Sequence, residues 1–110
     1  MEDKLIIARK TKRTIDYIEK NIYNISNDYK VLKERILNCL YDILENVYRA
    51  NIEQDRKYKE EVIVQIKMLN YYLKKCMDLE LITKSKFLNY GKYLSEIHDM
   101  VNSWMEYEKD

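Results

Sequence analysis

The chain has 110 residues, of which 35% are charged and 46% are hydrophobic, and its formal net charge is +1 at pH 7. This length suits one domain, which we expect to span residues 1–110, and the near-neutral charge excludes a broadly basic protein that attracts nucleic acid over long range. The sequence contains no proline and only one glycine, Gly91. Because sheet-rich and loop-rich folds need many turn residues, this scarcity predicts a few long helices.

The first helix is predicted from about Asp3 to Tyr23. Apolar and small side chains recur there at alternating spacings of three and four residues, which aligns them on one face. These side chains are Ala8, Thr11, Ile15, Ile18, Ile22 and Ile25. The polar run 26–28 then supplies cap and turn residues that separate this helix from the next one.

The second helix is predicted from about Tyr29 to Ile52, and the third from about Lys57 to Leu79. The second helix carries a wide apolar stripe, which is typical of a helix that packs against more than one neighbour. The inner positions of the two helices are Leu32, Ile36, Leu40, Ile43 and Val47, then Val62, Ile66, Leu69, Leu73 and Cys76.

The fourth helix is predicted from about Lys84 to Tyr107, with Thr83 as its N-cap and with Leu81 and Ile82 closing the preceding connection. Its inner positions are Tyr90, Leu94, Ile97, Val101 and Trp104. A glycine inside a helix costs about 1 kcal/mol relative to alanine, so we expect a neighbouring helix or ring to approach Gly91 closely. Trp104 could be a buried structural residue or an anchor between subunits.

Four helices of matched length joined by short connections predict an all-α fold, the antiparallel up-down-up-down four-helix bundle. Cys39 and Cys76 both lie on apolar stripes, where cysteine behaves as a small hydrophobic residue. We expect them to be reduced, which fits a cytoplasmic protein. No stretch approaches the roughly 20 apolar residues of a membrane span, so we expect no membrane partner.

Groups that could carry catalysis are scarce in this sequence. His98 is the only histidine, and Glu96 lies two residues from it rather than the three of a di-iron bundle site. The residues four to six positions before His98 include no arginine, unlike those of the bundle-type ribonucleases of the HEPN kind. The two cysteines are too far apart for a zinc motif. We therefore expect no enzyme, no metal site and no cofactor.

Two clusters could bind nucleic acid or a protein partner. The first, on the first helix, comprises Arg9, Lys10, Lys12 and Arg13. The second, on the third helix, alternates phosphate-binding cations with rings able to stack on bases, and comprises Lys67, Tyr71, Tyr72, Lys74 and Lys75. For either cluster alone, a solvated helix face is the favoured account. A ring of identical copies would change that weighting, because symmetry multiplies a modest patch into a strong field.

The stretch 81–104, LITKSKFLNYGKYLSEIHDMVNSW, resembles the closing helix of the accessory variability determinant proteins of diversity-generating retroelements. That family belongs to a wider group of bacterial four-helix bundles that includes the proteins of ribosomal RNA intervening sequences. The stretch LKERILNCLYDILENVYRAN looks like the family's second helix. Two departures are Asn102 and Ser103, where the family often has glycines, and NISNDYK, which replaces a connection that usually contains proline. The similar positions are Leu81, Ile82, Thr83, Phe87, Glu96, Ile97 and Trp104, and upstream Tyr48, Arg49, Ala50 and Asn51.

The resemblance implies a homopentamer of four-helix protomers that binds a reverse transcriptase, the RNA of the element and its cDNA. In that role the protein supports mutagenic cDNA synthesis, and the polymerase performs all the chemistry. A structural or regulatory protein-interaction bundle without nucleic-acid binding is the alternative, and the near-neutral charge favours it. A small ribonuclease or toxin is disfavoured by the lone histidine, His98.

Overall fold

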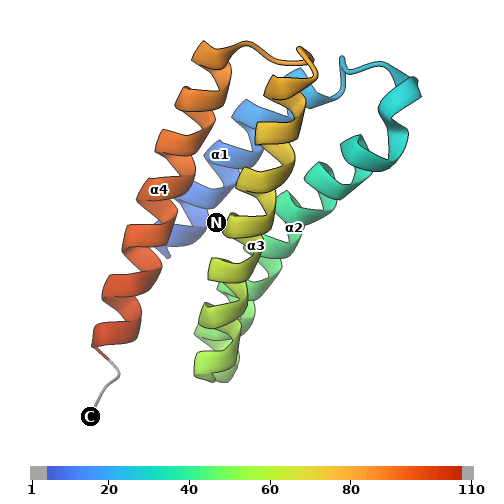
Figure 1. Ribbon diagram of the computed structural model, residues 1–110. Coiled ribbons are helices and arrows are strands. Elements are labelled where there is room, and N and C mark those ends of the chain that lie inside the picture. The colour runs from blue at the N-terminus through green and yellow to red at the C-terminus, as the bar shows by residue number, and fades with distance from the viewer. Residues whose placement is uncertain (1–4, 108–110) are drawn as a thin grey trace.

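The computed structural model describes residues 5–107, which form four α-helices and one short 3₁₀ helix and contain no strand (Figure 1). The α-helices are packed in the cyclic order α1–α2–α3–α4, so that α1 and α3 lie diagonally opposite one another. The bundle measures 47 × 29 × 23 Å. This arrangement confirms the predicted all-α four-helix bundle. The elements are α1 (Ile6–Ile22), η1 (Asn27–Tyr29), α2 (Lys30–Glu53), α3 (Arg56–Asp78) and α4 (Lys84–Glu106).

The helix bounds agree closely with those predicted from the apolar periodicity. Helices α2, α3 and α4 begin and end at the predicted residue or at its immediate neighbour. Helix α1 ends at Ile22, next to the predicted Tyr23. The predicted start of the first helix, Asp3, lies outside the described residues.

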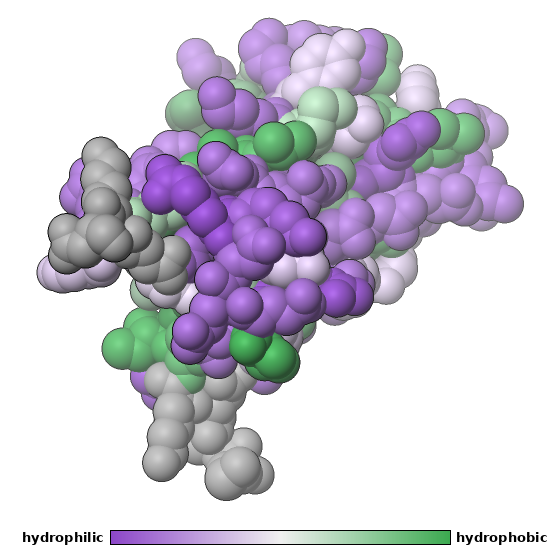
Figure 2. All heavy atoms as spheres, turned by 90° about the horizontal axis from the view of Figure 1, so that it is seen from below, coloured by the Kyte–Doolittle hydropathy of each residue, from purple (hydrophilic) through white to green (hydrophobic). Residues whose placement is uncertain are grey.

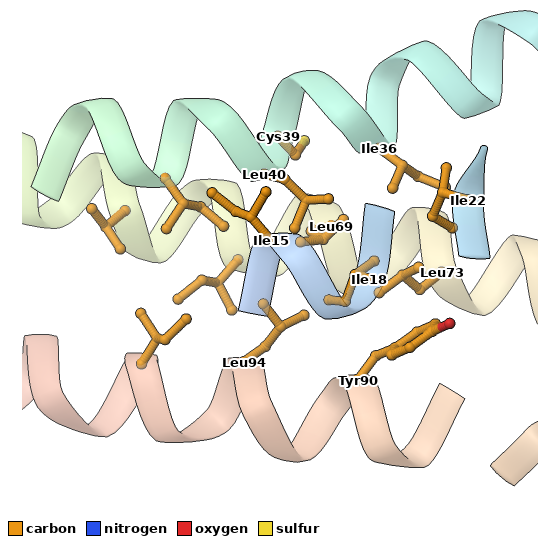
Figure 3. Close-up of a cluster of buried hydrophobic side chains, with 14 of the residues drawn as sticks. Ile15, Ile18, Ile22, Ile36, Cys39, Leu40, Leu69, Leu73, Tyr90 and Leu94 are labelled. Atoms are coloured by element: carbon orange, nitrogen blue, oxygen red, sulfur yellow. The ribbon is translucent and has the colours of Figure 1, made fainter. Parts of the chain in front are cut away.

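The predicted apolar stripes meet in one continuous core between the helices, part of which is drawn in Figure 3. All the predicted inner positions are buried except Leu32 and Trp104, which are half-buried. The one hydroxyl on the α1 stripe is satisfied locally, because Thr11 Oγ1 donates a hydrogen bond to the carbonyl oxygen of Ile7 at 2.7 Å. Periodicity alone was therefore sufficient to identify the core-facing side of each helix.

The two cysteines lie in this core, as predicted. Cys39 is 6% exposed and Cys76 is completely buried, and both are free thiols. Burial raises the pKa of each thiol to about 11, because the charged thiolate is poorly solvated there. Both residues therefore stay neutral near pH 7 and serve as small apolar side chains.

The link between α1 and α2 is closed by a side chain from the second helix. Lys33 Nζ donates hydrogen bonds to the carbonyl oxygens of Tyr23 at 2.9 Å and of Ile25 at 3.0 Å. Carbonyl groups at a helix C-terminus lack partners within the helix, and a cation placed there also interacts favourably with the helix dipole. Ser26 accepts a hydrogen bond from the backbone N–H of Asp28 at 3.2 Å and caps η1, as its residue type predicted.

Both remaining links pass through a residue with a left-handed backbone. Gln54 has φ 55° after α2, and Glu80 has φ 62° after α3. At the second link, the N–H of Leu81 bonds to the carbonyl oxygen of Cys76 at 2.8 Å, and that of Glu80 bonds to Met77 at 3.0 Å. This pair of bonds defines a Schellman motif, in which the left-handed position is usually a glycine.

The start of α4 follows the sequence prediction. Thr83 is the N-cap, and its hydroxyl accepts a hydrogen bond from the N–H of Lys86 at 3.1 Å. Ile82 is buried and Leu81 half-buried, so both fill the connection. The prediction for Gly91 is wrong, because a Cβ built on this residue would meet no atom within 4 Å. Gly91 lies at the edge of the α4 stripe, and no neighbouring helix or ring approaches it.

Candidate nucleic-acid and partner interface

The first predicted cluster lies on α1, but its four cations face different surroundings. Arg9 and Lys10 are half-buried, whereas Lys12 and Arg13 are exposed. Lys10 forms an ion pair with Glu96 of α4, and its ammonium lies 5.3 Å from the ring centroid of Tyr93. Lys10 therefore joins α1 to α4, and its charge is largely neutralised within the chain.

A run of aromatic rings extends this contact along the seam between α1 and α4. The Tyr17 ring packs against Tyr93 with ring centroids 4.8 Å apart, and against Tyr90 edge-to-face at 5.5 Å and 79°. Tyr90 is completely buried, and burial raises the pKa of its phenol. Both rings act in packing, and the buried Tyr90 is not accessible for stacking on bases.

Lys12 and Arg13 are the cations of this cluster that a ligand can reach most readily. The Lys12 ammonium lies 5.6 Å from the ring centroid of Tyr48, on α2. Arg13 forms no ion pair with any residue in the range 5–107. An exposed guanidinium without a carboxylate beside it is free to contact phosphate or a partner's carboxylate.

The second predicted cluster lies on the outer face of α3. Lys67, Lys74 and Lys75 are exposed there, and Tyr71 is 55% exposed. Lys74 pairs with Asp78 at 3.2 Å, and the Lys75 ammonium lies 5.6 Å from the Tyr71 ring centroid. Exposed ion pairs of this kind are worth little, so Lys74 can exchange its carboxylate for another anion.

The fold does not bring the two clusters together. Helix α1 packs directly against α2 and α4, whereas its backbone does not come close to that of α3 over the part of the chain that the structure describes. The α1 cluster lies in the first half of its helix, whereas the α3 cluster lies in the second half of a parallel, diagonally placed helix. The two clusters therefore occupy opposite sides of one copy and lie toward opposite ends.

Lys59 is a cation that the sequence analysis did not single out. It is completely buried, and its ammonium lies 4.3 Å from the ring centroid of Trp104, over the face of the indole. The sequence signal was its spacing, because Lys59 lies three residues before Val62 on the α3 stripe and so faces inward. Trp104 also lines a groove of about 590 Å³ with Ile6, Met100 and Tyr107, between the start of α1 and the end of α4.

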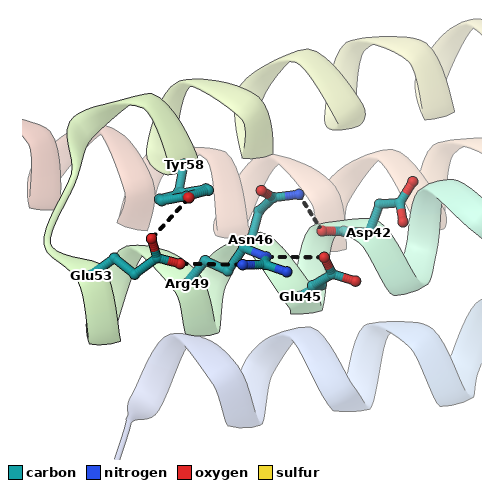
Figure 4. Close-up of polar contacts among 6 residues, drawn as sticks. All are labelled: Asp42, Glu45, Asn46, Arg49, Glu53 and Tyr58. Atoms are coloured by element: carbon teal, nitrogen blue, oxygen red, sulfur yellow. Dashed lines mark hydrogen bonds and ion pairs between the residues drawn. The ribbon is translucent and has the colours of Figure 1, made fainter.

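The end of the bundle seen in Figure 2 is mainly hydrophilic, with apolar side chains showing in several patches. At the nearby α2–α3 hairpin, Arg49 pairs with Glu45 at 3.1 Å and with Glu53 at 3.2 Å (Figure 4). The Tyr58 hydroxyl donates a hydrogen bond to the same Glu53 at 2.9 Å and so joins α3 to this group. Arg49 lies in the stretch that resembles the family's second helix. In this chain its guanidinium is therefore engaged by two carboxylates of its own helix.

The chemistry around His98 is simple. Its ring is half-buried, and the Asn102 side-chain amide lies 3.0 Å from Nδ1, which it can reach as a donor. Across residues 5–107, no group of three or more histidine, cysteine, aspartate or glutamate side chains is placed to hold a metal ion. None of the helices in that range is both long and apolar enough to cross a bilayer.

Compared with known proteins, the sequence matches no protein-family model and no curated protein. The positions that carry the resemblance have clear structural roles in this chain. Ile82 and Ile97 are buried, Thr83 caps α4, Glu96 pairs with Lys10, and Trp104 lies under Lys59.

Proposed function

We propose that the chain is a non-enzymatic, oligomeric accessory protein that binds a retroelement reverse transcriptase with its RNA and cDNA and supports mutagenic cDNA synthesis. The observation that carries the proposal is the outer face of α3, where Lys67 and Lys74 flank the exposed ring of Tyr71. Single-stranded nucleic acid is bound by such combinations, because cations attract the backbone and an aromatic ring stacks on a base without regard to sequence. Arg13 on α1 offers a second phosphate contact.

The groove beside Trp104 supports the oligomeric part of the proposal. Ile6 is 62% exposed and Tyr107 is 87% exposed at its edges, so a large apolar area faces solvent in a single copy. Tryptophan and tyrosine side chains at such positions often supply most of the binding energy between subunits. A ring of copies would also place the Lys67–Tyr71–Lys74 surface of one copy beside that of the next.

Two measurements test the proposal. The molar mass in solution, determined by light scattering with and without a generic single-stranded RNA at low salt, should approach five chains and should rise with RNA. Fluorescence anisotropy should then show weaker RNA binding for Lys67→Glu and for Arg13→Glu, while Lys92→Glu on the exposed face of α4 serves as the matched control. Unchanged RNA binding in both variants would remove the site assignment, and a monomer that ignores RNA would remove the function.

The polymerase part requires its own test. The chain should be co-expressed with a reverse transcriptase encoded beside it and with the neighbouring template repeat, and cDNA should be sequenced. Omission of the chain should abolish cDNA from the template, and Lys67→Glu should reduce its yield more than Lys92→Glu does. Equal cDNA yield with and without the chain would contradict the proposal.

A structural or regulatory protein-interaction bundle is the second candidate, and specific charges favour it. The net charge is only +1, and carboxylates of the same chain neutralise Lys10 and Lys74. A bundle of this kind would bind protein and leave RNA unbound at low salt, which the anisotropy measurement distinguishes directly.

A further inference from the structure

The first turns of α2 diverge from the last turns of α3 (Figure 1), and the side chains there leave a groove of about 600 Å³ on the surface. A smaller hollow of about 290 Å³ continues it along the same two helices and shares Arg35 and Tyr72 with it. We call this combined feature the α2–α3 groove. The first part is lined by Asp28, Tyr29, Lys30, Val31, Leu32, Arg35, Tyr72, Lys75 and Leu79.

The walls of the larger part of the α2–α3 groove are mainly apolar, whereas the smaller hollow is lined by polar side chains as well. Val31 is 72% exposed and Leu79 is 48% exposed, one on each wall, and the half-buried Tyr72 and Leu32 lie between them. Farther along, Met68 is 39% exposed on the α3 wall. Apolar groups gathered in one concave surface favour a ligand that removes them from water.

Two cations lie within this apolar surface. Neither Arg35 of α2 nor Lys75 of α3 forms an ion pair with any described residue from 5 to 107, and the Lys75 ammonium lies 5.6 Å from the ring centroid of Tyr71. Lys30 at the open end pairs with Glu34 at 4.0 Å, and Asp28 lies at the same end. Asp42 lines the smaller hollow at the other end. The middle of the groove, between Asp28 and Asp42, therefore carries positive charge, and a bound partner gains most if it brings carboxylates to this point.

We propose that the α2–α3 groove binds an amphipathic acidic helix from a partner protein. Apolar residues of that helix, spaced three or four positions apart, contact Val31, Tyr72 and Leu79, and its glutamate or aspartate residues pair with Arg35 and Lys75. Helices are commonly bound in this way, with apolar anchors in a groove and charges along its rim. From Met68 to Leu79 the α3 wall is roughly 16 Å long, which accommodates about three turns of a helix.

The chemistry of the walls favours a helix over nucleic acid. Nucleic acid gains little from aliphatic side chains such as Val31 and Leu79, because its own binding groups are phosphates and base rings. The groove shares Lys75 with the second predicted cluster and otherwise lies beside the Lys67–Tyr71–Lys74 face, where the Tyr71 and Tyr72 ring centroids are 5.8 Å apart. Binding of an acidic helix requires neither RNA nor a reverse transcriptase, so this proposal goes beyond the proposed function.

The probe is a fluorescein-labelled, alanine-based peptide of about 16 residues, or roughly 24 Å as a helix, with leucines along one face and glutamates beside them. Its binding to the full chain is followed by anisotropy at low salt. The peptide should bind saturably, and a scrambled peptide of the same composition should bind at least about tenfold more weakly. Val31→Asp and Leu79→Asp should each weaken binding about tenfold, while the control Ile52→Asp, at a 76% exposed position at the far end of α2, should not.

A charge exchange makes the assignment specific. The double variant Arg35→Glu and Lys75→Glu should lose the glutamate peptide and should gain binding of the same peptide with lysine at every glutamate position. Lys92→Glu should change neither affinity. Circular dichroism checks that each variant remains helical. All the substituted groove positions are exposed, and the half-buried Tyr72 is left intact.

Three results would overturn the proposal. One is the absence of saturable binding of the glutamate peptide at low salt. Another is binding that the Asp substitutions at Val31 and Leu79 leave unchanged, because the peptide would then lie elsewhere. The third is loss of RNA binding in the single variant Arg35→Glu together with no peptide binding, which would make the groove a nucleic-acid site, because Arg35 lies outside both predicted clusters.

Discussion

Gly91 is the only glycine of the chain, and it lies inside α4 with open space where a side chain would be. Glycine lowers helix stability because it loses the most backbone freedom on folding. Gly91→Ala should therefore raise the free energy of unfolding by about 0.5–1 kcal/mol, measured from the urea midpoint. The reciprocal control, Ser95→Gly on the exposed face of the same helix, should lower it. A loss of stability in Gly91→Ala would mean that a side chain cannot be accommodated there.

Lys59 and Trp104 form the most deeply buried cation contact among the described residues. In a desolvated setting a cation over an indole ring stabilises by up to about 2 kcal/mol. A double-mutant cycle with Lys59→Met and Trp104→Leu should give a coupling energy of about 0.5–2 kcal/mol, because the two side chains contact each other directly. Methionine retains most of the apolar volume of lysine, which limits the cavity term.

The control pair for that cycle combines Lys59→Met with Met77→Leu, a core-edge residue near the opposite end of α3. Changes that share no contact should add within about 0.5 kcal/mol. A Lys59–Trp104 coupling as small as that of the control pair would show that the ring contact contributes nothing. The position of Lys59 on the stripe was visible in the sequence, whereas its partner was not, because Trp104 comes from another helix.

At the scale of the elements, the link from α3 to α4 carries Glu80 in the left-handed conformation that its Schellman motif requires. A side chain with a Cβ is strained there, at a cost of roughly 1 kcal/mol, whereas glycine is not. Glu80→Gly should therefore raise the free energy of unfolding by about 0.5–1 kcal/mol, measured by urea denaturation.

Glu80→Ala is the matched control, since alanine keeps the Cβ and removes only the carboxylate. It should leave stability close to that of the parent chain. Equal gains for glycine and alanine would show that the carboxylate, not the backbone conformation, limits stability at this link.

The position and the buried face of an element were predictable from sequence where they depend on residues of that one helix. The periodicity of Ile15, Ile18 and Ile22 places the α1 stripe, and the residue type of Thr83 marks the start of α4, because both signals are local. The breaks were predicted correctly although neither glycine nor proline marks them. The surroundings of Gly91 were not predicted correctly, because the space around a residue depends on neighbouring helices that the local sequence does not describe.

At the scale of the whole molecule, the candidate site was predictable as residue types but not as a surface. The sequence showed cations on two helices, yet the order in which helices pack decides whether the cations meet. Glu96 removes Lys10 from the α1 cluster, and the diagonal placement of α1 and α3 separates Arg13 from Lys67. Packing of α2 against α3 also brings Arg35 and Lys75 to the same groove, although the two residues lie far apart in the sequence.

This separation gives a prediction for the salt dependence of RNA binding. Each released counterion steepens the dependence, with a slope of log K on log salt of about −0.7 per phosphate contact for single strands. One face of a single copy offers only Lys67, Lys74 and Lys75, so one copy binding alone should give a slope near −2, as an estimate of about −0.7 for each of three contacts.

If the functional unit is a ring of copies, as proposed, a strand can contact the same face on several protomers at once. The slope should then be steeper than about −5, because contacts from adjacent copies add. Anisotropy titrations over a range of salt concentrations give the slope. Lys67→Glu should reduce the magnitude of the slope by more than the roughly 0.7 of a single phosphate contact, because the change recurs in every copy. A slope that stays shallow in an assembly with the mass of five chains would mean that this face points away from the bound strand.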